Sequence, residues 1–232
     1  MGTRNITRVR SNGEVKINQY CQWDGYPTGR GLDVLKFCRD LAKDGRVSEL
    51  KDYLETTSII NANKADYNNH TYTGAPYFSK TGEVFDFVYD YGRMHPEYYG
   101  CALIDKMLDE GLLSMDDAKY YAVASRDVGN EILSFVTKHK PEEMKFYTDD
   151  YLSDMTMEGD WQIEGMFLVD LDEQSAEIWW HGLGVEFPFK QLVNYSDDDL
   201  SKDMKRLEDG DIGEGVGEGV RTPTEEIGGM EL

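Results

Sequence analysis

The sequence predicts an α+β fold in which an N-terminal and a C-terminal β-hairpin join one antiparallel sheet, with a helical middle region packed on one face. Three observations lead to this prediction: an Asn-Gly pair between two strand-like segments, a second pair of strand-like segments near 161–189, and helical spacing of apolar residues between them. With 232 residues, 40% of them hydrophobic, the chain can bury a core. Residues 1–207 are expected to form a single domain, and residues 208–232 a disordered, acidic, Gly-rich tail.

Residues 1–45 are predicted to form a hairpin, a loop and a helix. Asn12-Gly13 lies between the two strand-like segments and supplies the positive φ angles that a tight hairpin turn requires. Residues 22–31 contain three glycines and a proline, a turn composition that ends the second strand. Apolar residues then recur at helical spacing from residue 32, and Gly45 is suited to end that helix.

The middle of the chain is predicted to be mainly helical. A short helix is expected over 47–54, followed by a polar, Asn-rich loop over 56–82 that is longer than compact domains normally contain. Both a functional role and disorder stay open for this loop. Two further helices are expected over 97–110 and 115–138, the second capped by Ser114.

The C-terminal third is predicted to form the second hairpin and a last helix. Residues 161–171 and 176–189 are aromatic and β-branched, and the four residues between them have a turn composition. A helix is expected over 197–207, with Ser196 as its N-cap. The segment after residue 208 is rich in Gly and Glu with little to bury, which predicts the disordered tail.

The formal net charge is −21, and most of it lies near the C-terminus. Residues 1–50 carry +3, residues 51–140 carry −5 and residues 141–232 carry −19. A charge of this sign disfavours direct binding to nucleic acid or to an anionic membrane. Three interpretations of the acidic end stay open: a solvated face, a docking surface for a basic partner, and cation binding. The candidate residues of a docking surface are Asp149, Asp150, Asp154, Asp197, Asp198 and Asp199.

The cysteines and histidines give no signature of a metal or catalytic site. The three cysteines form no CxxC pair, and their odd number favours a reducing compartment. The N-terminus lacks the apolar run of a signal peptide, and no 18-residue apolar stretch occurs, so a cytoplasmic location without membrane insertion is expected. The four histidines are scattered, residues 170–173 lack the later ligands of a calcium loop, and no GxSxG motif is present. No catalytic residue, metal ligand or cofactor is therefore assigned.

The segment 20–27 is the most unusual one, because it places two large aromatic residues, an amide and a carboxylate on one tight loop before a helix. Loops on a rigid scaffold often carry binding groups. A purely structural corner is the alternative, since Asp24 before Gly25 can close a turn. The candidate ligand- or partner-binding residues are Tyr20, Gln22, Trp23, Asp24, Tyr26 and Arg30. Arg30 and Arg39 could also hold an anion between them.

A family resemblance rests on Met1-Gly2-Thr3-Arg4 and on a block made of Tyr20, Gln22-Trp23-Asp24-Gly25-Tyr26-Pro27, Gly29 and Gly31. These residues resemble a family of bacteriophage, prophage and bacterial proteins that begin with MGTR and carry YxQWDGYPxGxG. The strand 166–171 also resembles the closing hairpin of that family. Cys21 departs from the pattern, because a small residue is expected there. The resemblance implies a phage origin.

An accessory phage protein is similar in setting to inhibitors of host defence, many of which are acidic and occupy a nucleic-acid channel. The leading hypothesis is a non-enzymatic inhibitor in the host cytoplasm whose acidic surface docks on a basic host protein that handles nucleic acid, such as a defence nuclease complex. The alternative is a hydrolase or small-molecule-binding domain with a site under the Trp23–Tyr26 loop. A third hypothesis is a structural phage protein without a discrete site.

Overall fold

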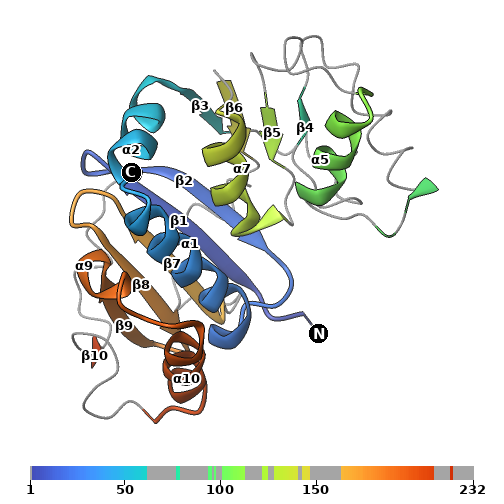
Figure 1. The fold of residues 1–232 in the computed structure, drawn as a ribbon. Coiled ribbons are helices and arrows are strands. Elements are labelled where there is room, and N and C mark those ends of the chain that lie inside the picture. Colours follow the sequence, from blue (N-terminus) through green and yellow to red (C-terminus); the bar gives the residue numbers. More distant parts are fainter. Residues whose placement is uncertain are drawn as a thin grey trace.

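The computed structural model describes residues 2–61, 77–78, 94–95, 97, 101–112, 122–124, 128–140, 143–146, 163–211 and 220–221. These residues form a larger and a smaller β-sheet with helices packed against them, an α+β arrangement (Figure 1).

The N-terminal hairpin consists of β1 (Asn5–Ser11) and β2 (Glu14–Cys21), which pair antiparallel. Asn12 and Gly13 at its turn have φ angles of 51° and 76°. Both angles are positive, as a two-residue turn that follows the strand twist requires, so the hairpin prediction is confirmed.

The C-terminal strands are β7 (Gly165–Asp170), β8 (Ser175–Trp180) and β9 (Leu183–Pro188), which pair antiparallel in this order. The segment 176–189, predicted as one strand, is therefore two strands. The chain reverses at His181-Gly182, where the φ angles are 47° and 81°. Of the predicted tail 208–232, β10 (Val220–Arg221) pairs antiparallel with β9, and most of the remainder lies outside the described residues.

The two hairpins join through β1 and β7, which run parallel. The larger sheet has the order β10-β9-β8-β7-β1-β2 and is mixed, so the prediction of one antiparallel sheet is wrong. The physical reason is the connection between the two strands. A tight turn joins antiparallel neighbours, whereas strands joined by a long crossover with helices can run parallel.

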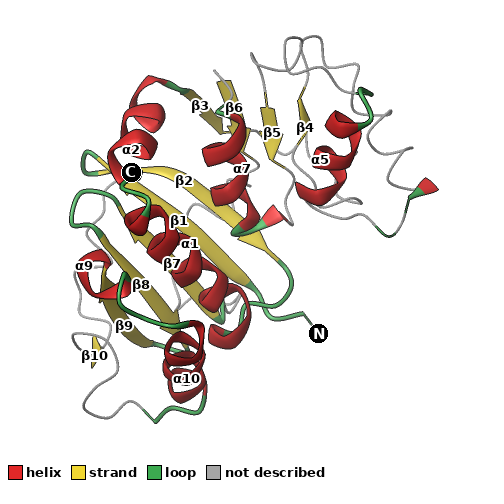
Figure 2. Ribbon diagram, in the orientation of Figure 1, coloured by secondary structure: helices red, strands yellow, loops and turns green. Residues whose placement is uncertain are grey.

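Helices cover one face of this sheet (Figure 2). After the short helical turn η1 (Pro27–Gly31) come α1 (Leu32–Lys43) and α2 (Val47–Thr56), and the C-terminal part adds α9 (Phe189–Leu192) and α10 (Asp197–Glu208). The helices on this face thus come from both ends of the chain. The core between them and the sheet contains Val9, Ile17, Val34, Leu35, Phe167, Val169 and Ile178.

Two helix ends lie at the residues that the sequence predicts for them. Gly45 follows α1 with a φ of 68°, which suits a residue without a side chain. At the start of α10, the Asp199 backbone N–H donates to Ser196 Oγ over 3.2 Å, and the Ser196 N–H donates to Asp199 Oδ2 over 3.1 Å. This reciprocal capping box confirms the predicted last helix.

The smaller sheet has the order β3-β6-β5-β4. Its strands are β3 (Ser58–Asn61), β4 (Tyr77–Phe78), β5 (Ala122–Ala124) and β6 (Glu143–Phe146), and the nearby helices are α5 (Cys101–Asp109) and α7 (Glu131–His139).

A single helix over 115–138 is a wrong prediction, because β5 occupies 122–124 and α7 begins only at Glu131. Gly129, with a φ of 58°, separates the two. Short apolar runs do not distinguish a strand from a helix by their spacing, and the Gly-Asn pair before α7 was the available break signal. The predicted cap Ser114 lies outside the described residues.

Candidate functional site

The loop between β2 and α1 is held in place by its own backbone. The Gly25 N–H donates to the Thr3 carbonyl over 3.2 Å, and the Arg30 N–H donates to the Asp24 carbonyl over 3.0 Å. The buried Asn5 side chain adds a hydrogen bond from Nδ2 to the Trp23 carbonyl, 3.0 Å long. These contacts fix the loop to the first residues of the chain and to β1.

Close backbone approaches tighten the loop further. A Cβ on Gly165 would lie 2.3 Å from the Gly25 carbonyl oxygen, and a Cβ on Gly25 would lie 2.8 Å from Asn5 Cβ. Neither position has room for a side chain. Glycine is therefore needed where β7 and the loop meet.

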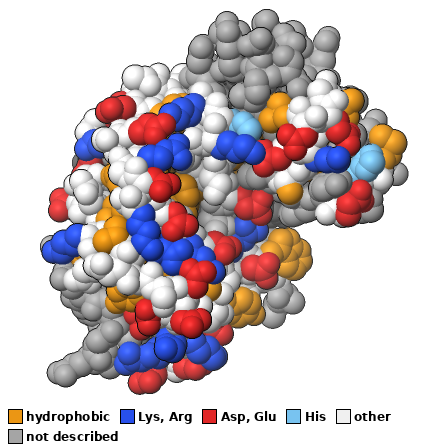
Figure 3. All heavy atoms as spheres, viewed as in Figure 1, with side chains coloured by type: hydrophobic (Ala, Val, Ile, Leu, Met, Phe, Trp, Pro, Cys, Tyr) orange, Lys and Arg blue, Asp and Glu red, His pale blue; other side chains and the backbone are white. Residues whose placement is uncertain are grey.

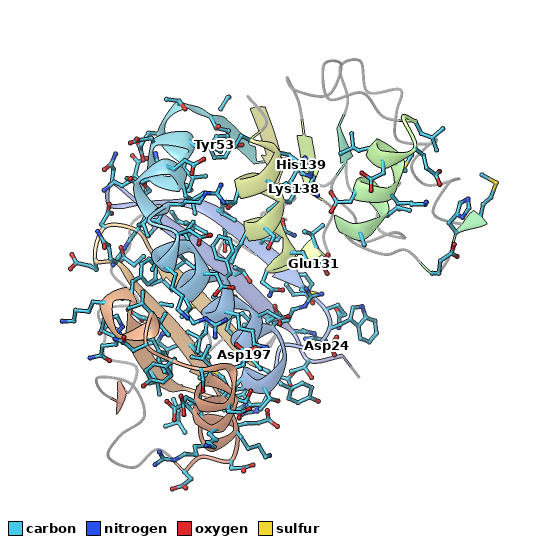
Figure 4. All side chains as sticks on the ribbon, viewed as in Figure 1. Asp24, Tyr53, Glu131, Lys138, His139 and Asp197 are labelled. Carbon is cyan, nitrogen blue, oxygen red and sulfur yellow. The ribbon has the colours of Figure 1, made fainter. Side chains whose placement is uncertain are left out.

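Trp23, Asp24 and Tyr26, here called the loop tip, lie at the surface of this loop, and the Trp23 ring rests against Gly2, where a Cβ would come within 2.6 Å of it. The side chains of Trp23 and Tyr26 are 52% and 43% exposed. Asp24 lies between them with a φ of 56°, and within the described part of the chain its exposed carboxylate makes no hydrogen bond or ion pair (Figure 4). The Tyr26 ring packs on buried Trp180 with 5.5 Å between ring centroids, which orients it.

Tyr20 and Gln22, two predicted binding residues, lie apart from the tip. Tyr20 is buried with Ile6 and Ile163. The Tyr20 hydroxyl is 2.7 Å from Gln22 Oε1 and donates to it. Side chains alternate between the faces of a strand, so Tyr20 and its neighbour Cys21 point to opposite faces of β2.

Arg30 extends toward α7. Its Nη1 donates to Asn130 Oδ1 over 2.6 Å and to Glu131 Oε1 over 3.1 Å. Arg39 is held by Asp40 and Asp197 over 2.9 and 2.5 Å. Each guanidinium already holds carboxylates of the chain, so the structure gives no support to an anion clamp made of Arg30 and Arg39.

The predicted acidic docking residues on α10 largely serve the fold. Asp197 accepts from Arg39, a hydrogen bond that lowers the pKa of its carboxyl. Asp199 closes the capping box, and the Ser196 hydrogen bonds lower its pKa likewise. Asp198 is exposed. Acidic and basic side chains alternate over the face seen in Figure 3. Asp149, Asp150 and Asp154 lie outside the described residues.

A groove of about 700 Å³ between α1 and α7 was missed by the sequence reasoning. One wall is α1, with Asp33, Phe37, Asp40, Leu41 and Asp44. The other wall is the start and outer side of α7, with Asn130, Glu131, Ser134, Thr137 and Lys138. The signal that could have found it is the Gly-Asn pair before residue 131, which sets where α7 begins.

Cys21 and Cys38 are buried and form no disulfide among the described residues, and burial raises the pKa of the Cys38 thiol. A thiol of this kind is unreactive. Among the described residues, no group of three or more His, Cys, Asp or Glu side chains is placed to hold a metal ion. In the same residues, every helix is too short or too polar to cross a lipid bilayer.

Comparison of the chain with protein-family models, with curated proteins and with solved structures finds no match.

Proposed function

We propose that this chain is a non-enzymatic binding protein that docks on a basic partner protein, with the loop tip as its anchor. The observation that carries the proposal is the rigid display of Trp23 and Tyr26, both exposed, on either side of a carboxylate that has no hydrogen-bond or ion-pair partner among the described residues. A Lys or Arg of a partner can pair with Asp24 while its cation contacts the aromatic rings. Trp and Tyr are also the residues that most often dominate binding energy at interfaces.

The rigidity of the loop supports a role in binding. A loop that is already ordered loses little conformational freedom when a partner docks, so more of the contact energy appears as affinity. Exposed aromatic rings on a loop tied to Thr3 and Asn5 meet this condition. A positive φ at a non-glycine residue such as Asp24 is a local strain that persists only where the surroundings impose it, and such residues cluster at functional sites.

The overall charge supports a basic partner. A net charge of −21 attracts cationic surfaces and speeds their encounter, an effect that salt weakens. The sequence resembles a family of phage and prophage proteins. We therefore propose that the partner is a host protein that handles nucleic acid, and that docking inhibits it. The acidic residues of α10 then contribute to long-range attraction rather than to a dedicated docking patch.

The proposal is tested by capturing proteins from a bacterial lysate on immobilised wild type, Trp23→Ala and Asp24→Asn. We expect the wild type to retain a basic protein, and both variants to retain at least tenfold less of it, as for an interface hot spot. Leu112→Ala is the matched control, because Leu112 is 42% exposed and lies after α5, away from the loop. Capture of the same proteins in equal amounts by all four samples would contradict the proposal.

A second candidate, small-molecule binding beneath the loop, is favoured by one specific observation. Asn5 Oδ1 and Thr7 Oγ1 belong to fully buried side chains and have no hydrogen-bond partner within the residues that the structure describes. An unmade hydrogen bond of this kind costs about 1–3 kcal/mol, which a bound molecule with N–H or O–H donors would offset. Asn5 is also the register partner of Cys21, under the loop.

Native mass spectrometry of the protein purified from cells tests this candidate. We expect a bound small mass on the wild type that is absent from Thr7→Val, which removes one acceptor and keeps the shape of the side chain. A wild type that carries only the polypeptide mass, together with a Thr7→Val variant that unfolds at a higher temperature, would reject it.

A further inference from the structure

The groove between α1 and α7 adjoins the loop at the end where Arg30 holds Glu131 (Figure 4). Its α1 wall is a single stripe, because Asp33, Phe37, Asp40, Leu41 and Asp44 recur at the three-, four- and seven-residue spacings of one helix face. Leu41 is buried and Phe37 is half-buried against the core, so the stripe has an apolar centre between acidic ends.

The three cations that line the groove are held by acids that do not line it. Lys36 pairs with Asp197 over 3.8 Å, and Lys138 pairs with Asp105 over 2.5 Å. Arg46 pairs with Glu49 over 2.8 Å. A ligand in the groove therefore meets basic side chains that already have an acidic partner outside the groove.

Two carboxylates of the groove, by contrast, make no direct ion pair among the described residues and can therefore bind a ligand. Asp40 and Glu131 hold Arg39 and Arg30. Asp33 and Asp44 are exposed and make no hydrogen bond or ion pair through their side chains within the described part of the chain, and their charges act at longer range on Arg30 and Arg46. They lie eleven residues apart on one helix, which corresponds to about 16 Å.

We propose that this groove seats an extended segment of the basic partner, with one Lys or Arg on Asp33, a second on Asp44, and an apolar side chain between them on Phe37. The inference rests on the proposed function and names the part of the partner that is recognised. Residues i, i+2 and i+4 of an extended chain share one face and span about 13 Å between their outer Cα atoms. Two long basic side chains reach the remaining distance.

An extended guest fits the groove better than a helical one. An extended chain covers the distance between Asp33 and Asp44 with about half as many residues as a helix, because it rises about 3.3 Å per residue and a helix about 1.5 Å. The expected recognition pattern is therefore basic, any residue, apolar, any residue, basic. Asp33 and Asp44 also disfavour the binding of an acidic chain, because like charges would face each other.

The probe for this inference is a fluorescein-labelled peptide with the core Lys-Thr-Leu-Thr-Lys, titrated with the full-length protein and followed by fluorescence anisotropy. We expect saturable binding that weakens at least tenfold in the Asp33→Asn/Asp44→Asn double variant, and also weakens in 300 mM salt. The reordered peptide Leu-Thr-Lys-Lys-Thr, with the same charge, should bind at least tenfold more weakly than the probe.

The matched control is Asp52→Asn/Asp109→Asn, which removes two exposed carboxylates from α2 and α5 and changes the net charge by the same amount. Equal binding of the peptide to the wild type and to the Asp33/Asp44 double variant would overturn the inference, as would equal loss in the control or no binding by the wild type. Trp23→Ala should bind the peptide like the wild type, because the loop tip lies outside the groove lining. The experiment therefore distinguishes a wrong proposal about the groove from a wrong proposal about the loop tip.

Discussion

At the scale of single residues, Asp172 connects three segments of the larger sheet. Its carboxylate accepts from the backbone N–H groups of Asn12 and Gly13 over 2.9 and 2.8 Å, and from Lys51 Nζ over 2.6 Å. The turn of the C-terminal hairpin thereby holds the turn of the N-terminal hairpin and α2. The Lys51 hydrogen bond, followed by the bonds from the two N–H groups, lowers the pKa of Asp172 to about 2.

We predict that Asp172→Asn lowers the melting temperature at pH 7 and that the difference from wild type shrinks as the pH falls from about 4 to 2. An Asp in an unfolded chain has a pKa of about 3.9, and the folded value is lower. The stability that this shift provides is therefore complete above pH 4 and is lost as the pH falls through the folded pKa. Thermal unfolding followed by circular dichroism measures it, with the exposed neighbour Glu173→Gln as control. If the difference in melting temperature between wild type and Asp172→Asn stays constant with pH, the lowered pKa of Asp172 does not contribute to stability.

The residues of the candidate site show how far sequence reasoning reaches at this scale. The exposed positions Trp23, Asp24 and Tyr26 lie in a segment that Gly and Pro mark as a loop, so their placement on the surface follows from local composition. Arg30 differs, because its partners Asn130 and Glu131 are a hundred residues away in sequence. Contacts of that kind depend on the whole fold and leave no local signal.

At the scale of elements, the parts set by short-range interactions were predictable. The N-terminal turn needs only two residues with positive φ, and the start of α10 needs only Ser196 and Asp199. The smaller sheet was not predictable in the same way. β5 is three residues long and is defined by its partners β4 and β6, which are far from it in sequence. Its apolar residues fit a helical spacing equally well.

The parallel pairing of β1 and β7 belongs to the same class of long-range features. Each hairpin has its own turn signal, but no local pattern states which strands of two hairpins become neighbours or in which direction they run. The groove depends on a similar relation, since its walls come from helices that are separated in the chain by the smaller sheet. The groove and the mixed sheet thus followed only from the three-dimensional arrangement.

At the scale of the whole molecule, the β1–β7 pairing places the two ends of the chain in one core. Phe167 on β7 is opposite Thr7 on β1 and is fully buried. Its ring packs against the start of α1, where a Cβ on Gly31 would come within 3.3 Å of it. The Phe167 side chain thereby contacts Gly31, the residue that precedes α1, from a strand that pairs with β1.

We therefore predict that Phe167→Ala lowers the free energy of unfolding by about 3–5 kcal/mol, the usual loss for a buried Phe. Because the core is shared, the urea midpoints from circular dichroism, which reports the helices, and from tryptophan fluorescence, which reports Trp23, Trp161, Trp179 and Trp180, should fall together. Leu112→Ala, at an exposed position, should move neither midpoint by a comparable amount. If the two midpoints separate in Phe167→Ala, the helices and the surroundings of the tryptophans do not unfold as one cooperative unit.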